Sequence, residues 1–91
     1  MKINLIKFNT EIWQEGKMYV AYAPQLDISS CGKTAVEAKK NIQESVALFF
    51  EETRKRGTTS QILKEAGFSF RKNKEWQAPE LISFERMQLA L

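Results

Sequence analysis

A long amphipathic helix between residues 34 and 57 is the feature that most constrains the fold of this 91-residue chain. Thr34 and Glu37 form a capping box, in which the Thr hydroxyl accepts from the Glu amide and the Glu carboxylate reaches back. Gly57 is the residue type that commonly ends a helix. Such a short chain has room for one domain, residues 1–91, so the other elements must pack against this helix. Apolar residues at helical spacing predict its core face, namely Ala38, Ile42, Val46 and Phe49, joined by Ala35 and Phe50.

Three strands are predicted before the helix. Residues 2–13 begin with an apolar–polar alternation that includes Ile3, Leu5 and Phe8 and is typical of a half-buried strand. Residues 14–17 are polar with one Gly, which favours a hairpin turn. Residues 18–23 are apolar on both faces, as in a central strand, and Pro24 ends them because it cannot donate to the ladder. Residues 28–31 predict a short third strand.

The C-terminal part predicts one more helix and one more strand. Thr58 and Gln61 have the spacing of a second capping box, which begins a short helix that runs to Gly67. Residues 68–79 mix aromatic residues with a basic loop, and residues 81–91 return to strand character. The predicted class is therefore α+β with the order β-β-β-α-α-β. We expect a small, antiparallel-rich sheet with the main helix packed on one face.

Composition excludes several kinds of chemistry. The sequence has no His, and its single Cys31 permits neither an intrachain disulfide nor a zinc site built from several Cys residues. The cluster Ser29-Ser30-Cys31 has no His to act as a base, and Cys31 is interpreted as a small buried hydrophobe. The four Gly residues are scattered and form no phosphate-binding loop. We therefore expect that the chain is not an enzyme and that it has no catalytic residue, bound metal or cofactor.

The charge is mildly basic, with 14 basic and 11 acidic residues. The simpler interpretation of the basic clusters is a solvated helix end and a solvated loop; the alternative is a contact with nucleic acid. The aromatic residues either complete a small core or, if exposed, stack on bases. No apolar run reaches the roughly 18 residues of a membrane span, and a lone thiol without an export signal predicts a cytoplasmic location. The clustered basic residues are Arg54, Lys55, Arg56, Arg71, Lys72 and Lys74.

The predicted last strand carries an apolar row made of Met87, Leu89 and Leu91. A monomer with this row at a sheet edge would expose it to water and leave the edge open. A contact with a second copy buries the row, so we expect a homo-oligomer that uses these residues. The alternative is that the row lies under the chain's own helix.

Three stretches, residues 19–27, 30–38 and 41–46, resemble the HicB family of type II antitoxins. That family typically shows a strand ending in Pro-Glu-Leu, then Gly-acidic-Thr-x-x-Glu-Ala, then Asn-Ile-x-Glu-Ala-Ile/Val. Gln25 and Lys33 depart from this pattern. The matching residues are Pro24, Leu26, Gly32, Thr34, Glu37, Ala38, Asn41, Ile42, Glu44 and Val46.

The resemblance implies a degraded ribonuclease-H-like fold of order β-β-β-α-β and a role as a cytoplasmic antitoxin. Family members neutralise a partner toxin, HicA, a ribonuclease that cleaves mRNA. We take Tyr22, Gln25, Leu26 and Asp27, in and after the Pro-Glu-Leu-like strand end, as the candidate contacts with a HicA-like toxin. The family's C-terminal DNA-binding domain has no counterpart here, so direct DNA binding is not expected. The competing hypothesis is a stand-alone nucleic-acid-binding or regulatory domain that uses the two basic clusters.

Overall fold

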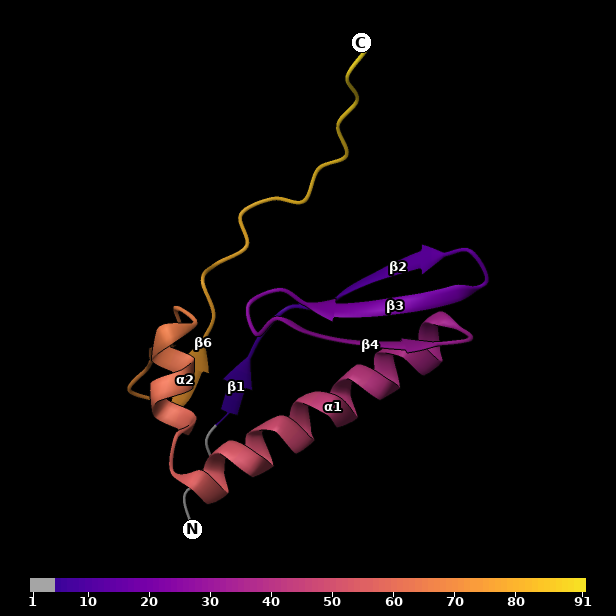
Figure 1. Ribbon diagram of the computed structural model, residues 1–91. Coiled ribbons are helices and arrows are strands. Elements are labelled where there is room, and N and C mark those ends of the chain that lie inside the picture. Colours follow the sequence, from indigo (N-terminus) through magenta and orange to yellow (C-terminus); the bar gives the residue numbers. More distant parts are fainter. Residues whose placement is uncertain (1–4) are drawn as a thin grey trace.

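The computed structural model describes residues 5–91 and has an α+β fold (Figure 1). Ile3, which the sequence assigns to the first strand, lies outside these residues. The strands form two three-stranded sheets, of order β2-β3-β4 and β1-β6-β5. The elements are β1 (Leu5–Lys7), β2 (Glu11–Glu15), β3 (Met18–Ala23), β4 (Ile28–Gly32), α1 (Ala35–Arg56), α2 (Thr59–Glu65), β5 (Ser69–Phe70) and β6 (Glu75–Gln77).

The sheet β2-β3-β4 is antiparallel, as predicted. Its register places Trp13 opposite Val20, and Val20 opposite Cys31. Gly16 has φ 61° at the first position of the two-residue β2–β3 turn, the position that needs a positive φ in a type II′ turn. Because side chains alternate along a strand, residues 19, 21 and 23 face one side of this sheet and residues 18, 20 and 22 face the other.

Helix α1 begins and ends where the sequence predicts. The Thr34 hydroxyl accepts a hydrogen bond from the Glu37 amide at 3.0 Å, and the Glu37 carboxylate accepts one from the Lys33 amide at 3.3 Å. At the other end Gly57 has φ 70°, a left-handed conformation. The Gly57 and Thr58 amides donate to the carbonyls of Arg54 and Thr53 at 3.1 and 2.9 Å, the pair of bonds of a Schellman motif.

Small residues set the distance between α1 and the sheet. Ala21 and Ala23 of β3 and Ala38 of α1 are fully buried, and Gly32 at the end of β4 is buried beside them. A Cβ atom at Gly32 would lie 2.6 Å from the Ala38 amide nitrogen and 2.9 Å from the Glu37 carbonyl carbon. Real Cβ atoms do not approach backbone this closely, so the first turn of α1 packs on β4 only because residue 32 has no side chain.

The core face of α1 is the predicted one in its first half except at Ala35, which is exposed, and it differs again near its end. Ala38, Ile42 and Val46 are buried, as predicted, and Thr53 continues their stripe. Phe49 is half-buried and lies beside the Phe50 ring, at a centroid distance of 5.1 Å, instead of joining the core. The expectation for Phe49 is therefore wrong. The adjacent Phe50 packs against the core in its place.

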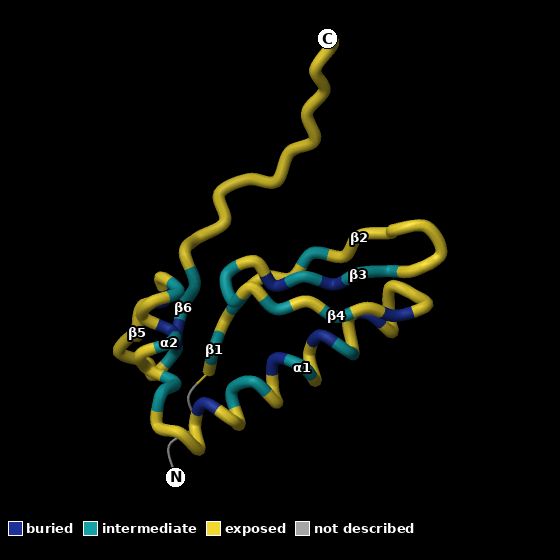
Figure 2. The backbone as a smooth tube through the Cα atoms, in the orientation of Figure 1, coloured by how far each residue is buried: buried dark blue, intermediate teal, exposed yellow. Residues whose placement is uncertain are grey.

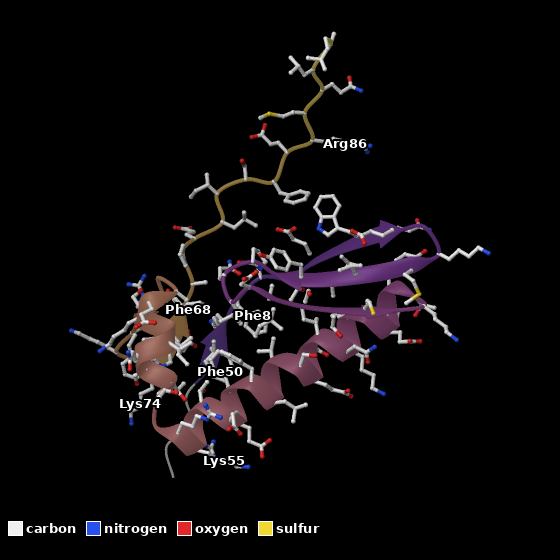
Figure 3. All side chains as sticks on the ribbon, in the orientation of Figure 1. Phe8, Phe50, Lys55, Phe68, Lys74 and Arg86 are labelled. Carbon is white, nitrogen blue, oxygen red and sulfur yellow. The ribbon has the colours of Figure 1, made fainter. Side chains whose placement is uncertain are left out.

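The second sheet and α2 enclose their own apolar cluster, formed by Leu63, Phe68 and Trp76. Here β6 pairs in parallel with β1 and in antiparallel with β5. Figure 3 shows Phe8, Phe50 and Phe68 close together between α1, α2 and β1. Three residues pack against both this cluster and the core under β2-β3-β4, and so make the two cores continuous: Phe8, Leu26 and Phe50.

The predicted first strand is two strands. Residues 8–10 separate β1 from β2, and each part joins a different sheet. Taken as one bent segment, β1 and β2 give the strand order β4-β3-β2/β1-β6-β5. The alternation continues through Phe8, which lies on the inner side with Ile6, and Phe8 packs against both cores at the point where the strand breaks.

Three further predictions differ from the structure. Residues 68–79 contain the short β5–β6 hairpin, which the mixed composition of this stretch did not predict. Residues 81–91 belong to no strand and extend away from the body (Figure 1). The Thr58 side chain does not cap α2, because its backbone, with φ −111° and ψ 3°, is not extended and its hydroxyl lies 3.4 Å from the Thr53 carbonyl. The second capping box is therefore wrong.

We predict that Gly32→Ala lowers the free energy of unfolding by about 1–3 kcal/mol, because the added methyl forces α1 away from β4. Urea unfolding, followed by circular dichroism, measures this change. Ser30→Ala, which adds no atoms to the same strand, is the control. A Gly32→Ala chain as stable as the control would show that the close contact does not limit the fold.

The two neighbouring phenylalanines on α1 should differ in their contribution. We predict that Phe50→Ala costs about 2–4 kcal/mol because it opens a cavity between the two cores, whereas Phe49→Ala costs less than half as much. The same unfolding measurement compares them. Equal losses would contradict the core face described above.

Candidate protein interface

One face of the sheet β2-β3-β4 is left open. Helix α1 packs against the other face, where Ala21 and Ala23 lie. On the open face the Trp13 side chain is 51% exposed and Met18 and Cys31 are also exposed (Figure 2). By strand alternation and register, the open face consists of Glu11, Trp13 and Glu15 from β2, Met18, Val20 and Tyr22 from β3, and Ser29 and Cys31 from β4.

Two of the predicted contact residues, Tyr22 and Asp27, are joined at the end of this face. The Tyr22 hydroxyl donates a hydrogen bond to the Asp27 carboxylate at 2.9 Å. Asp27 has φ 53°, a conformation that Asp tolerates better than most residues. The turn from β3 to β4 is closed by a bond from the Leu26 amide to the Ala23 carbonyl at 3.1 Å. The turn thus holds the only aspartate of the chain against the sheet's exposed tyrosine.

The open face has a negatively charged rim. The hydrogen bond to Asp27, partial burial and the negative charges of Asp27 and Glu11 raise the pKa of Tyr22 above its ordinary value of 10.0. Glu11 also accepts a hydrogen bond from the Trp13 indole at 2.9 Å. Glu15 lies on the same side of β2, two residues beyond Trp13. The face therefore combines aromatic and apolar side chains with three carboxylates, which suits a basic protein partner better than a nucleic acid.

The other two predicted contact residues, Gln25 and Leu26, make contacts within the fold. The Gln25 amide group bonds to Asn9 twice, accepting from its backbone N–H at 3.1 Å and donating to its side-chain oxygen at 2.8 Å. Leu26 is half-buried and packs against both core clusters. Gln25 thus fixes the loop between β1 and β2, and Leu26 holds the β3–β4 turn to the core. Of the four predicted residues, Tyr22 and Asp27 are the pair joined at the open face.

The basic clusters lie at the other end of the molecule, around the end of α1 and the β5–β6 turn (Figure 3). Lys55 pairs with Glu51 at 3.6 Å, and Arg56 pairs with Glu52 at 2.9 Å. Arg71 donates to the Gln77 side chain at 3.0 Å. Arg54, Lys72 and Lys74 are exposed. Of the aromatic residues predicted to stack on bases, Trp76 is only 5% exposed and belongs to the core.

An open hollow beside the second sheet is lined by Lys7, Asn9, Arg71 and Gln77 and by residues 78–81. Its two cations are already engaged, since Lys7 pairs with Glu75 at 3.1 Å and Arg71 bonds to Gln77. The Lys7 ammonium lowers the pKa of Glu75. The hollow therefore holds the Lys7–Glu75 ion pair and the Arg71 guanidinium, which keeps its positive charge when it bonds to the neutral Gln77 amide.

The predicted oligomer residues lie outside the body of the molecule. Met87 and Leu89 are each 83% exposed, and Leu91 is exposed as well. The alternative that this row packs under the chain's own helix is wrong. Figure 2 shows residues 80–91 as an uninterrupted exposed segment.

Sequence reasoning missed Glu11, Trp13 and Met18 as members of the open face, and it placed Cys31 wrongly in the core. Cys31 is exposed because it pairs with Val20 on the side that α1 does not cover. The missed signal is register. Once Gly16 and Lys17 are taken as a two-residue turn between paired strands, Trp13 falls opposite Val20, on the same face as Tyr22.

No group of three Asp, Glu or Cys side chains within residues 5–91 gathers closely enough to hold a metal ion. In the same part of the chain, neither helix has the length and apolar character needed to cross a membrane.

We predict that Asp27→Asn lowers the pKa of Tyr22 toward 10, because it removes the negatively charged acceptor that favours the protonated phenol. Ultraviolet absorbance during an alkaline titration, in a Tyr19→Phe background, measures this pKa. Glu11→Gln is the comparison and should produce a smaller decrease. An unchanged pKa in Asp27→Asn would contradict the hydrogen bond.

In comparisons with known proteins, no protein-family model, no curated protein and no solved structure matches the chain.

Proposed function

We propose that this chain is a HicB-like antitoxin module that binds a small HicA-type ribonuclease by protein–protein contact and occludes its RNA-binding or active surface. The observation that carries the proposal is the open face of β2-β3-β4, where exposed Trp13 and half-buried Tyr22 lie among carboxylates. Aromatic residues of this kind commonly anchor protein interfaces. In this proposal the chain acts in the cytoplasm and as a homo-oligomer.

The order of elements supports the comparison with that family. When β1 and β2 are counted as one bent strand, three antiparallel strands precede α1, and β6 follows it in parallel with β1. The family's ribonuclease-H-like domain has the order β-β-β-α-β, to which this chain adds α2 and β5. Several matching motif residues have structural roles here, such as Asn41, whose side chain bonds the Cys31 carbonyl at 2.8 Å.

Charge supports a basic partner. Glu11, Glu15 and Asp27 surround the open face although the whole chain carries a net charge of +3. A ribonuclease that binds the negatively charged RNA backbone presents basic residues on its RNA-binding surface. Complementary charge on the open face raises the rate of encounter with such a surface and covers the residues that RNA would contact.

The competing function, nucleic-acid binding through the basic clusters, has less support. Two of the six basic residues are paired with glutamates on α1, and Arg71 bonds to Gln77. Phe70, 50% exposed, is the one aromatic ring next to the basic turn in the sequence that is available for stacking. The experiment below treats this function as an alternative outcome.

The test is inhibition of mRNA cleavage by a purified HicA-type ribonuclease. We predict that the purified chain inhibits cleavage of a labelled mRNA at near-equimolar ratio. The double variant Tyr22→Ala/Asp27→Lys should weaken inhibition at least tenfold, because it removes the aromatic contact and reverses a charge that faces the basic partner.

The matched control is Glu51→Lys, which makes the same charge change on the exposed side of α1. It should inhibit as well as the parent. Equal inhibition by the open-face variant and the control would contradict the proposed surface, and no inhibition by the parent would contradict the antitoxin role. Salt-dependent RNA binding by the chain alone, lost on Lys72→Glu/Lys74→Glu, would favour the nucleic-acid alternative.

A further inference from the structure

We propose that residues 87–91 of one copy add as a strand to the free edge of β2 in a second copy, so that two chains exchange their C-terminal tails in a dimer. The tail is defined here as residues 79–91. The added strand lies at the β2 edge of the open face and shares Trp13 with the toxin contact, but its test needs no toxin and can fail without the toxin contact failing.

The tail is too apolar to be a solvated segment. It leaves the ladder after Ala78, whose amide makes the last bond to the second sheet, to the Lys7 carbonyl at 3.3 Å. From Pro79 onward it extends away from the body, and Figure 3 places Arg86 far from both sheets. Six large apolar side chains on this segment are exposed: Leu81, Ile82, Phe84, Met87, Leu89 and Leu91. The body covers part of Leu81, which lines the hollow beside the second sheet, and the other five are 70% exposed or more.

The edge of β2 offers unpaired backbone of matching length. Among residues 5–91, β2 pairs with β3 alone. Glu15 and Met18 flank the two-residue turn, so antiparallel alternation points the N–H and C=O groups of Ile12 and Gln14 away from β3. Such an edge is a template for another strand. The opposite edge, β4, is partly closed by Asn41 of α1.

Side-chain placement favours the open face of the sheet for the apolar row Met87, Leu89 and Leu91. With Leu89 at the centre of residues 87–91 and Trp13 at the centre of β2, the two residues lie side by side whichever direction the added strand runs. On the open face, Met87, Leu89 and Leu91 continue the apolar surface of Trp13. On the other face α1 leaves Ile12 of β2 40% exposed, but Trp13, 51% exposed, is the larger uncovered apolar side chain of this strand. The half-exposed indole then gains an apolar neighbour that the isolated chain lacks.

The area is that of a small dimer interface. Three buried side chains per tail remove roughly 350–700 Å² of apolar surface for two tails, and the faces they cover add a similar area. Stable interfaces bury about 1,200–2,000 Å² in total, so the exchange reaches the lower end of that range. A reciprocal exchange, in which each copy accepts the tail of the copy that holds its own, is isologous and closes at two chains. The added strand lies beside β2, and Tyr22 and Asp27, one strand further in, stay free for the toxin.

The test is sedimentation of the full chain across a concentration series. The parent should be a dimer, and Met87→Lys/Leu89→Lys should be a folded monomer with its Trp13 emission shifted to the red. The matched control, Val36→Lys/Leu48→Lys, introduces the same charges at two exposed apolar positions on α1 and should stay dimeric. Gln14→Pro removes an outward N–H from the edge and should also yield monomers.

Cross-linking distinguishes exchange between copies from folding back within one. Two chains, both Cys31→Ser, carry either Trp13→Cys or Leu89→Cys. Mild oxidation of the mixture should produce a heterodimer in much higher yield than either chain alone produces homodimer. A monomeric parent, a dimeric tail variant, or equal cross-linking in all three samples would overturn the proposal. If the Lys variant fails to fold, the cross-linking result decides.

Discussion

The close approach of α1 to the end of β4 is the contact on which the rest of the structure depends. Gly32 has no room for a Cβ atom because the Ala38 amide would lie 2.6 Å from it. Three buried alanines continue this contact along α1 and β3, so the helix lies close against the sheet over its first half. One helix can then seal one face of a three-stranded sheet with few large side chains.

The use of small residues between α1 and the sheet determines where the remaining apolar surface lies. The large buried side chains gather near the end of α1, where Phe8, Leu26 and Phe50 join the two cores. The opposite face of β2-β3-β4 receives no helix, and its Trp13 and Met18 stay exposed. A sheet with one sealed and one open face is a natural binding surface, since its geometry is fixed by the sealed side and its contacts are free on the other. The proposed toxin contact and the proposed exchange of tails both use this difference between the faces.

Local signals in the sequence predicted local structure well. Thr34 and Gly57 mark the ends of α1 because capping depends on residues a few positions apart. The turn around Gly16 and the strand end at Pro24 were predicted for the same reason. Thr58 shows the limit of this approach, since its spacing to Gln61 suits a capping box but the preceding Schellman motif leaves its backbone in another conformation.

Features set by distant residues were harder to predict. The exposure of Cys31 depends on its register with Val20, and the split between β1 and β2 depends on a core that α2 and β6 complete. Residues 81–91 have the alternation of a strand but no strand partner among residues 5–91. Of the candidate site, sequence identified Tyr22 and Asp27, but the open face around them required the structure.

The free edge of β2, which we propose as the contact with the tail of a second copy, can be tested by amide hydrogen exchange. The Ile12 and Gln14 amides point away from β3, so the isolated chain leaves them to exchange freely with water. We expect slow exchange at these two amides and at alternate amides of residues 87–91 at high protein concentration, with fast exchange at all of them on dilution. Fast exchange at both concentrations would contradict it, and so would protection that does not change on dilution.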